Sequence, residues 1–245
     1  MTTNTCMLCG FSVVRGDLPA ILDDVLRRIG SGSGGWLLTL NTEMLARCTR
    51  EPSYAALIRQ ADIITADGMP LVWASRRKGA PIATRTTGVD LVDAYLRLPD
   101  VPAFAIIGGV DPAATLACYG DAARQACAYL YDGKVDLSDE QLALFERALQ
   151  DRSVKTVFIA LGVPKQDRLA LALRARLPHL VVTGIGGTFE ILGPQGSRAP
   201  QWMQRGGLEW LYRLVREPRR LWRRYLVNYP AGVRWLMRDV RDARR

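Results

Sequence analysis

Short runs of aliphatic residues alternate along this chain with longer segments in which apolar residues recur at helical spacing. The short runs predict buried strands. They are Trp36–Leu40, Asp62–Thr65, Phe104–Ile107, Val154–Leu161 and Leu180–Thr183. The longer segments predict helices, and they are Leu18–Ile29, Thr42–Gln60 (with a break at Pro52), Pro70–Lys78, Val89–Leu96, Pro112–Ala126, Asp139–Gln150 and Lys165–Leu177. This alternation predicts an α/β fold: a Rossmann-like, mostly parallel sheet sandwiched by helices.

The positive charge of the chain is concentrated at its C-terminal end. Residues 1–197 hold 20 basic and 20 acidic residues, whereas residues 198–245 hold 13 basic and 4 acidic ones. Composition and charge both change near Gly193–Gly196. We therefore predict an α/β domain over residues 1–197 and a basic helical appendage over residues 198–245. The charge of the appendage predicts an anionic partner, either a nucleic acid or an acidic lipid surface.

The appendage also carries apolar and aromatic residues at helical spacing. This stripe consists of Leu221, Trp222, Tyr225, Leu226 and Tyr229. The complementary face carries Arg216, Arg219, Arg220, Arg223 and Arg224. A helix packed on the core would show a similar stripe. Arginines combined with aromatic residues are more typical of a helix that lies on an anionic bilayer surface, which is our expectation here.

The remaining composition indicates a globular protein with few candidates for other chemistry. No apolar run reaches the length of about 18 residues that suggests a membrane-spanning helix, and residues 1–14 lack the pattern of a signal peptide, so we expect a cytoplasmic location. Cys6 and Cys9 fall on an expected first strand, where residues three apart point to opposite faces, so packing is favoured over a metal site. The single histidine, His179, fits a strand edge better than a catalytic position.

Glycines and hydrogen-bonding residues follow nearly every predicted strand. The carboxyl ends of parallel strands meet at one edge of a sheet, where ligands bind. Glycine allows a close backbone approach, and helix N-termini attract phosphate. This combination predicts a site for a nucleotide diphosphate. The candidate residues are Thr39, Asn41, Asp67, Arg85, Gln166, Gly186 and Gly187.

Each candidate also has a plainer interpretation. Asp67 precedes Gly68 and is a suitable turn residue. Arg85 and Gln166 are residue types that often lie exposed on a surface. The segment Gly184–Thr188 has some likeness to a dinucleotide fingerprint, but its glycine spacing differs from G-x-G-x-x-G, so no NAD or other cofactor is predicted.

Taken in order, the motifs resemble the WecG/TagA/CpsF family of glycosyltransferases over nearly the whole chain. The matching stretches are Thr39–Asn41, Ala61–Asp62, Asp67–Pro70, Arg85, Gly88–Leu91, Ala160–Asp167, Gly184–Glu190, Arg198–Pro200, Gly207–Leu214 and Glu217–Arg220. One departure is that Asp167 follows the Pro-Lys-Gln motif where many relatives carry glutamate. This change keeps the charge and leaves the resemblance intact.

The resemblance implies a Rossmann-like fold, a UDP-sugar donor and an undecaprenyl-diphosphate-linked sugar acceptor. It also implies inverting transfer without a metal, with Asp67 as the general base. The transferred sugar in the family is N-acetylmannosamine, its uronic acid or glucose. The implied substrate-binding residues are Thr39, Asn41, Arg85 and Gln166 from the core, with Arg213, Arg220 and Arg223 from the appendage.

The residues themselves support this chemistry. A carboxylate that takes a proton from an attacking hydroxyl typically contributes about 10²–10⁴-fold to the rate. The negative charge of a departing diphosphate needs either a metal or arginines, and no Asp-x-Asp follows a strand of the sheet. Arginine binds diphosphates in a bidentate way, so arginines are the better candidates.

The expected partners are therefore a UDP-sugar, a lipid-diphosphate-linked acceptor and the cytoplasmic face of the inner membrane, where we expect peripheral attachment. A nucleic-acid-binding Rossmann-like protein is the alternative interpretation. It explains the basic appendage but leaves the residues at the strand ends without a role. We therefore expect no nucleic-acid partner, and the sequence leaves the oligomeric state open.

Overall fold

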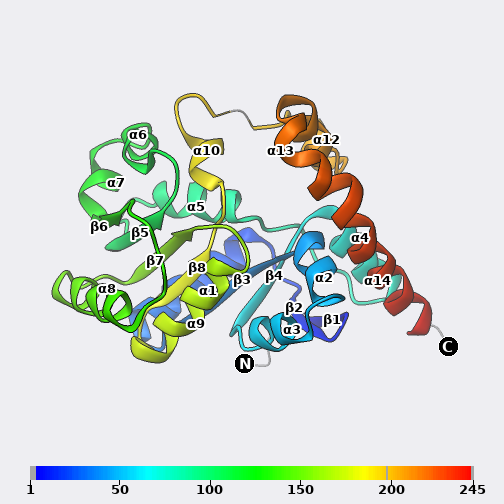
Figure 1. The fold of residues 1–245 in the computed structure, drawn as a ribbon, viewed down its shortest axis with the longest axis horizontal. Helices are drawn as coiled ribbons and strands as arrows, with labels where there is room; N and C mark the ends of the chain where they lie inside the picture. Colours follow the sequence, from blue (N-terminus) through cyan, green and yellow to red (C-terminus); the bar gives the residue numbers. More distant parts are fainter. Residues whose placement is uncertain (1–3, 197, 244–245) are drawn as a thin grey trace.

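Six parallel strands form one sheet between two layers of helices in the computed structural model of this chain (Figure 1). The structure describes residues 4–196 and 198–243, apart from the side chains of Arg205, Arg220 and Arg224. The strand order is β4-β3-β8-β7-β5-β6, and every neighbouring pair is parallel. The strands are β3 (Gly35–Asn41), β4 (Ile63–Asp67), β5 (Phe104–Gly108), β6 (Cys127–Tyr131), β7 (Thr156–Ala160) and β8 (Val181–Gly184).

Apolar side chains on the two faces of the sheet form two separate cores. On β3, Leu38 and Leu40 face one core, whereas Leu37 faces the other. The first core is covered by α2 (Thr42–Cys48), α3 (Pro52–Ile58), α4 (Met69–Arg77), α8 (Asp139–Asp151) and α9 (Lys165–Arg176). The second core is covered by α1 (Leu18–Ser31), α5 (Gly88–Leu96), α6 (Pro112–Ala117), α7 (Asp121–Ala126) and α10 (Thr188–Leu192). The predicted α/β fold is confirmed.

The five predicted strands and the break at Pro52 are confirmed, but in the middle of the chain one prediction is wrong and one strand was missed. The predicted helix Pro112–Ala126 is divided into α6 and α7, because Gly120 adopts a φ of 86° between them. The sixth strand, β6, was not predicted. It lies at the edge of the sheet with all of its residues only partly buried, so it lacks the buried aliphatic run that identifies the other strands.

The N-terminal segment forms an antiparallel hairpin of β1 (Thr5–Leu8) and β2 (Phe11–Val14), separate from the main sheet. Cys9 lies in the turn rather than on a strand, with a φ of 50°. Both Cys6 and Cys9 are buried as free thiols, and burial raises the pKa of Cys9 to about 12. Such thiols behave as packing residues. His179 is exposed and precedes β8, at the end of that strand opposite to Gly184.

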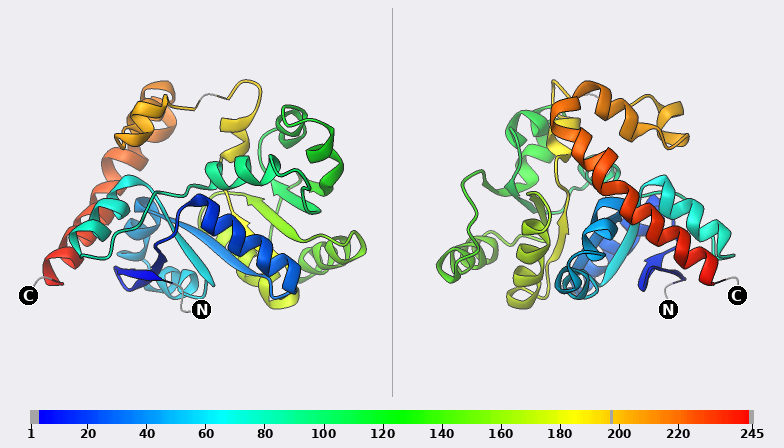
Figure 2. Two further views of the ribbon diagram at one scale, coloured as in Figure 1. Left: turned by 180° about the vertical axis from the view of Figure 1, so that it is seen from behind. Right: turned by 45° about the vertical axis from the view of Figure 1, so that its right-hand side comes forward.

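The appendage is a chain of helices that leaves the core and returns to it (Figures 1 and 2). It contains α11 (Gln201–Arg205), α12 (Glu209–Arg216), α13 (Pro218–Trp222), the π-helix η1 (Arg223–Asn228) and α14 (Tyr229–Asp242). Helix α14 packs on α2 and α4 and contributes buried Leu236 and Val240. A Cβ atom at Gly232 would lie 2.2 Å from the carbonyl oxygen of Thr42, so glycine permits the close contact between α14 and α2.

Candidate active site

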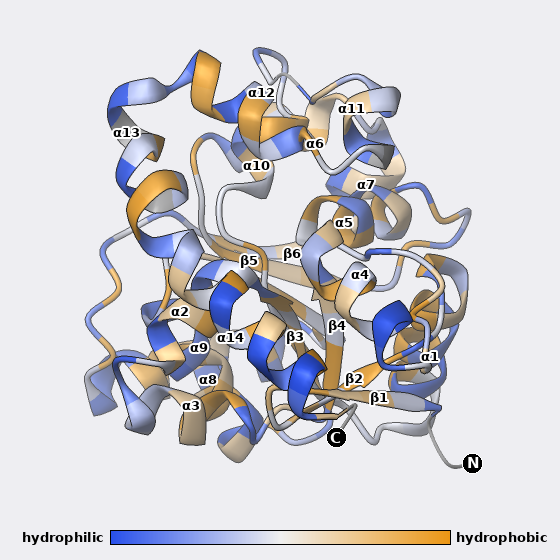
Figure 3. Cartoon of the chain, turned by 90° about the vertical axis from the view of Figure 1, so that its right-hand side faces the viewer, coloured by the Kyte–Doolittle hydropathy of each residue, from blue (hydrophilic) through white to orange (hydrophobic). Residues whose placement is uncertain are grey.

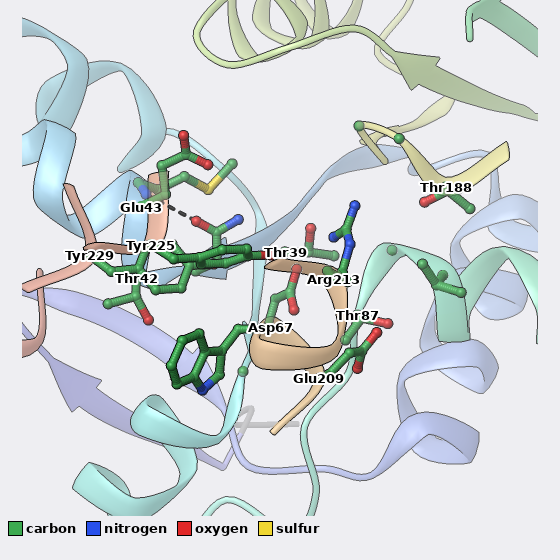
Figure 4. Close-up of a pocket in the computed structure, with 18 of the residues that line it drawn as sticks. Thr39, Thr42, Glu43, Asp67, Thr87, Thr188, Glu209, Arg213, Tyr225 and Tyr229 are labelled. Carbon is green, nitrogen blue, oxygen red and sulfur yellow. Dashed lines mark hydrogen bonds between the residues drawn. The ribbon is translucent and has the colours of Figure 1, made fainter. Parts of the chain in front are cut away.

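The carboxyl ends of the central strands form the floor of a cleft of about 1120 Å³. Residues of α12, α13, η1 and α14 form its opposite wall, so both the α/β core and the appendage line it. Figure 4 shows side chains from the two parts pointing toward one another across this space. The cleft therefore lies where the sequence predicts a ligand site.

Asp67 and Asn41 are the last residues of neighbouring parallel strands, and they are paired in register. Asp67 lies at the end of β4 and points into the cleft near Thr39, which β3 contributes (Figure 4). The side-chain oxygen of Asn41 accepts a hydrogen bond of 3.0 Å from the backbone N–H of Met44 and thereby caps α2. This bond fixes the orientation of the Asn41 amide at the cleft floor.

Gln166 and the glycines after β8 form one interlocked unit. The Gln166 side chain is buried, and its Oε1 accepts a hydrogen bond of 3.1 Å from the backbone N–H of Gly186. A Cβ atom at Gly184 would lie only 2.7 Å from Nε2 of Gln166, so the side chain packs directly on that glycine. Gly186 and Gly187 line the cleft beside it. The interpretation of Gln166 as an exposed surface residue is wrong.

The segment Thr87–Asp90 presents the N-terminus of α5 to the cleft. The Thr87 hydroxyl accepts a hydrogen bond of 3.0 Å from the backbone N–H of Asp90, and the Asp90 carboxylate accepts one of 3.2 Å from the backbone N–H of Thr87. This capping box fixes the first turn of the helix. Thr87 and Gly88 line the cleft. The partial positive charge of the helix end therefore faces the space in which an anion would bind.

Arg85 is held by two side chains of the appendage. Its Nη1 donates to Oε2 of Glu209 at 2.6 Å, and its Nη2 donates to Oε1 of Gln204 at 3.0 Å. The side chains of Arg85 and Glu209 are only 15% and 18% exposed. The interpretation of Arg85 as a solvated surface residue is therefore wrong. These bonds use two of the five N–H groups of its guanidinium.

The three appendage arginines named from the sequence lie in different places. Arg213 on α12 lines the cleft and points into it beside Thr39 (Figure 4). Arg223 is exposed, and its guanidinium lies 5.3 Å from the ring centroid of Trp222, outside the cleft lining. The side chain of Arg220 lies outside the part that the structure describes. Arg234 of α14, which was not predicted, also lines the cleft.

An aromatic wall on the appendage was missed by the sequence analysis. The rings of Trp210 and Tyr225 lie 5.9 Å apart, and those of Tyr225 and Tyr229 lie 4.8 Å apart. All three residues line the cleft. Leu221 and Tyr225 are buried, whereas Trp222 is 44% exposed. Leu221 and Tyr225 therefore pack toward the cleft, as in a helix packed on the core, whereas contact of the other residues of the stripe with a bilayer stays a prediction.

Asp167, next to Gln166, is a buried carboxylate at the start of α9. Its Oδ2 accepts a hydrogen bond of 2.7 Å from the Tyr54 hydroxyl, and among the described residues no partner reaches Oδ1. Burial raises the pKa of Asp167 to about 6, against the lowering effects of the Tyr54 hydrogen bond and the charge of Arg47. This carboxyl group joins α9 to α3.

Two kinds of feature are absent from residues 4–196 and 198–243. These residues contain no group of three or more His, Cys, Asp or Glu side chains that could hold a metal ion. They also contain no helix that is long and apolar enough to span a membrane.

Comparisons with known proteins identify the family of this chain. The chain is 29% identical over 224 residues to the N-acetylglucosaminyldiphosphoundecaprenol N-acetyl-beta-D-mannosaminyltransferase of Bacillus spizizenii, which covers 87% of this chain and 82% of that protein. It is 28% identical over 198 residues to a protein of the same name from Staphylococcus aureus (strain MRSA252), with coverages of 77% and 74%. The model of the glycosyl transferase WecG/TagA/CpsF family matches residues 6–245, so this chain belongs to that family and is a glycosyltransferase.

Proposed function

We propose that this glycosyltransferase transfers a sugar from a UDP-sugar to a polyprenyl-diphosphate-linked sugar, with inversion at the anomeric carbon. The names of its relatives support this substrate pair, since both act on N-acetylglucosaminyldiphosphoundecaprenol. N-acetylmannosamine is accordingly the first sugar to test, ahead of its uronic acid and glucose. The observation that carries the proposal is the carboxylate of Asp67, which faces Arg213 in one cleft at the carboxyl edge of the sheet.

Asp67 acts as the general base in this proposal. The acceptor hydroxyl attacks the anomeric carbon, its proton passes to the Asp67 carboxylate, and the bond from that carbon to the diphosphate oxygen breaks. UDP leaves with the bonding electron pair. Thr39, Asn41 and Gln166 bind the substrates at the cleft floor, where Gly186 and Gly187 allow a close backbone approach.

Arginines offset the charge of the departing diphosphate. Arg85 and Arg213 both line the cleft, and guanidinium groups match the geometry of phosphate oxygens. Arg220 on α13 and Arg223 at the start of η1 are retained as candidates for contact with the lipid-linked diphosphate. In this proposal the arginines perform the role that a metal ion performs in other transferases, so no metal is required.

The outer surface of the appendage suits attachment to an anionic bilayer. Large apolar side chains are exposed on it, and Figure 3 shows apolar and hydrophilic segments interleaved along α12 and α13. These exposed residues include Trp202, Leu211, Val215, Trp222 and Val227, none of which lines the cleft. Exposed Arg216, Arg219 and Arg223 lie among them. Apolar residues that enter the headgroup layer beside cations favour an acidic lipid surface, which also carries the acceptor.

A transfer assay tests this function. The purified protein is incubated with UDP-N-acetylmannosamine and N-acetylglucosamine linked through diphosphate to a short polyprenyl chain, and the lipid product is analysed by mass spectrometry. We expect a lipid product that is heavier by one N-acetylhexosamine residue, and equal activity with a metal chelator present. If no product formed with any of the three UDP-sugars, the proposal would be contradicted.

A further inference from the structure

The contact between Arg85 and the appendage connects two parts of the cleft that are far apart in the sequence. Arg85 comes from the segment between α4 and α5, whereas its partners Glu209 and Gln204 come from the appendage. Gln204 is itself fixed, because its Nε2 donates to the carbonyl oxygen of Ala199 at 2.7 Å. One guanidinium of the core therefore holds both α11 and α12.

The backbone next to this contact also lies close to the core. Gly207, between α11 and α12, has a φ of 71°, and a Cβ atom there would lie 3.0 Å from Cβ of Met69 and 3.1 Å from the Trp73 ring. Met69 and Trp73 belong to α4, which begins directly after Asp67 and Gly68. The start of α12 is thus seated on the helix that follows the proposed base.

Glu209 and Arg213 lie four residues apart on α12, so they lie on the same face of this helix. Glu209 contacts Arg85 at the edge of the core, and Arg213 points into the cleft about one helical turn further along (Figure 4). Because one helix carries both side chains, a displacement of Glu209 from Arg85 would displace Arg213 as well.

We infer that Glu209 is a positioning residue for Arg213: with Gln204, it seats α12 on Arg85 and so holds the Arg213 guanidinium over the diphosphate. This inference rests on the proposed function, because it is the diphosphate of that reaction that Arg213 contacts. Glu209 also lines the cleft, and in this inference it acts through Arg213 rather than through a contact with substrate. The ion pair is mostly buried, so it holds the helix more firmly than an exposed pair would.

Hydrogen exchange in the absence of any substrate tests the seating of α12. Loss of a charged hydrogen-bond partner of this kind should raise the equilibrium constant for local opening of α12 at least about tenfold. We therefore expect the amides of residues 201–216 to exchange at least about tenfold faster in Glu209→Ala than in the unmodified protein. The control Asp242→Asn changes an exposed acid of the same appendage and should leave these amides unaffected.

A double variant with the two charges reversed makes the hydrogen-exchange test specific to this ion pair. The pair Arg85→Glu with Glu209→Arg should restore slow exchange in residues 201–216, whereas either substitution alone should lose it. Unchanged exchange in Glu209→Ala, or a pair that exchanges as fast as the single variants, would overturn the inference. This measurement needs no nucleotide, so its result does not depend on the proposed reaction.

A double-mutant cycle on UDP affinity tests whether Glu209 acts through Arg213. We expect Glu209→Ala to weaken UDP binding at least about fivefold, and to have no further effect in the Arg213→Ala background. If instead each substitution weakened UDP binding by its own factor, and the two factors multiplied in the double variant, the inference would be overturned. If the unmodified protein neither bound UDP nor formed product, the proposed function would fail, while the exchange experiment would still decide the seating of α12.

Discussion

Two acidic residues near the cleft floor lie in contrasting environments. Asp67 lies at the end of β4 and lines the cleft, whereas Asp167 is fully buried behind Gln166. Burial raises the pKa of Asp167, which is the opposite of what a paired surface carboxylate shows. Asp167 is therefore assigned to the structure of the site, and Asp67 to its chemistry.

The Asp167 carboxyl group gives a pH dependence of stability. Because its folded-state pKa of about 6 lies above the ordinary aspartate pKa of 3.8, the folded protein binds more protons than the unfolded chain between these two values. The free energy of unfolding therefore falls as the pH rises through this window, by about 2 kcal/mol between roughly pH 4.5 and 7.5. Asp167→Asn should remove this part of the dependence.

Urea denaturation of both proteins at the two pH values provides the measurement. The asparagine retains an oxygen that accepts the Tyr54 hydrogen bond, so the comparison isolates the charge. We expect the variant to gain stability relative to the unmodified protein as the pH rises. An identical change in both proteins would show that Asp167 is already ionised at the lower pH.

Among the elements, helix α14 depends on one close contact with the core. A methyl group at Gly232 would meet the Thr42 carbonyl oxygen at 2.2 Å, so Gly232→Ala should force α14 away from α2 and lower the free energy of unfolding by about 1–3 kcal/mol. Gly30→Ala is the matched control, because no atom lies within 4 Å of a Cβ there. The control should be neutral or more stable by about 0.5–1 kcal/mol.

Thermal and chemical unfolding of the two variants gives the comparison. Equal stability of Gly232→Ala and the unmodified protein would show that α14 does not pack as closely as the structure has it.

The elements also explain how much could be predicted from the sequence. Asn41, Asp67 and Gln166 were found because each follows a buried run within a few positions, and parallel strands bring such positions together. Glu209 and Tyr225 were not predicted to line the cleft, because the direction of their side chains depends on how the appendage helices pack. The π-helix η1 interrupts the predicted single helix, so the register of the apolar stripe changes where no sequence signal marks it.

At the scale of the whole molecule, the basic appendage has two opposite surfaces. Its inner side completes the cleft with Arg213 and the aromatic wall of Trp210, Tyr225 and Tyr229. Its outer side exposes Val215 and Val227, which are 72% and 58% accessible. A membrane-bound acceptor would thus meet the cleft at the same edge that we assign to the bilayer.

Substitutions on the outer side test this membrane surface. Val215→Glu and Val227→Glu should each weaken binding to phosphatidylglycerol vesicles at least about fivefold, because each removes apolar contact and adds a charge that the anionic lipid repels. Leu144→Glu is the control, since Leu144 is 53% exposed on α8, outside the appendage.

Vesicle sedimentation measures this binding, with phosphatidylcholine vesicles as a neutral reference. If all three variants bound phosphatidylglycerol vesicles equally, or if DNA competed fully for the appendage, the membrane assignment would be contradicted.

In the proposed reaction a core carboxylate and appendage arginines act together on a UDP-sugar. The most direct measurement is the rate of transfer from UDP-N-acetylmannosamine to the lipid-linked acceptor by Asp67→Asn, compared with its affinity for UDP. We expect a rate that is lower by at least about 10²-fold with UDP affinity unchanged, because only the proton acceptor is lost. A transfer rate close to that of the unmodified protein would contradict it.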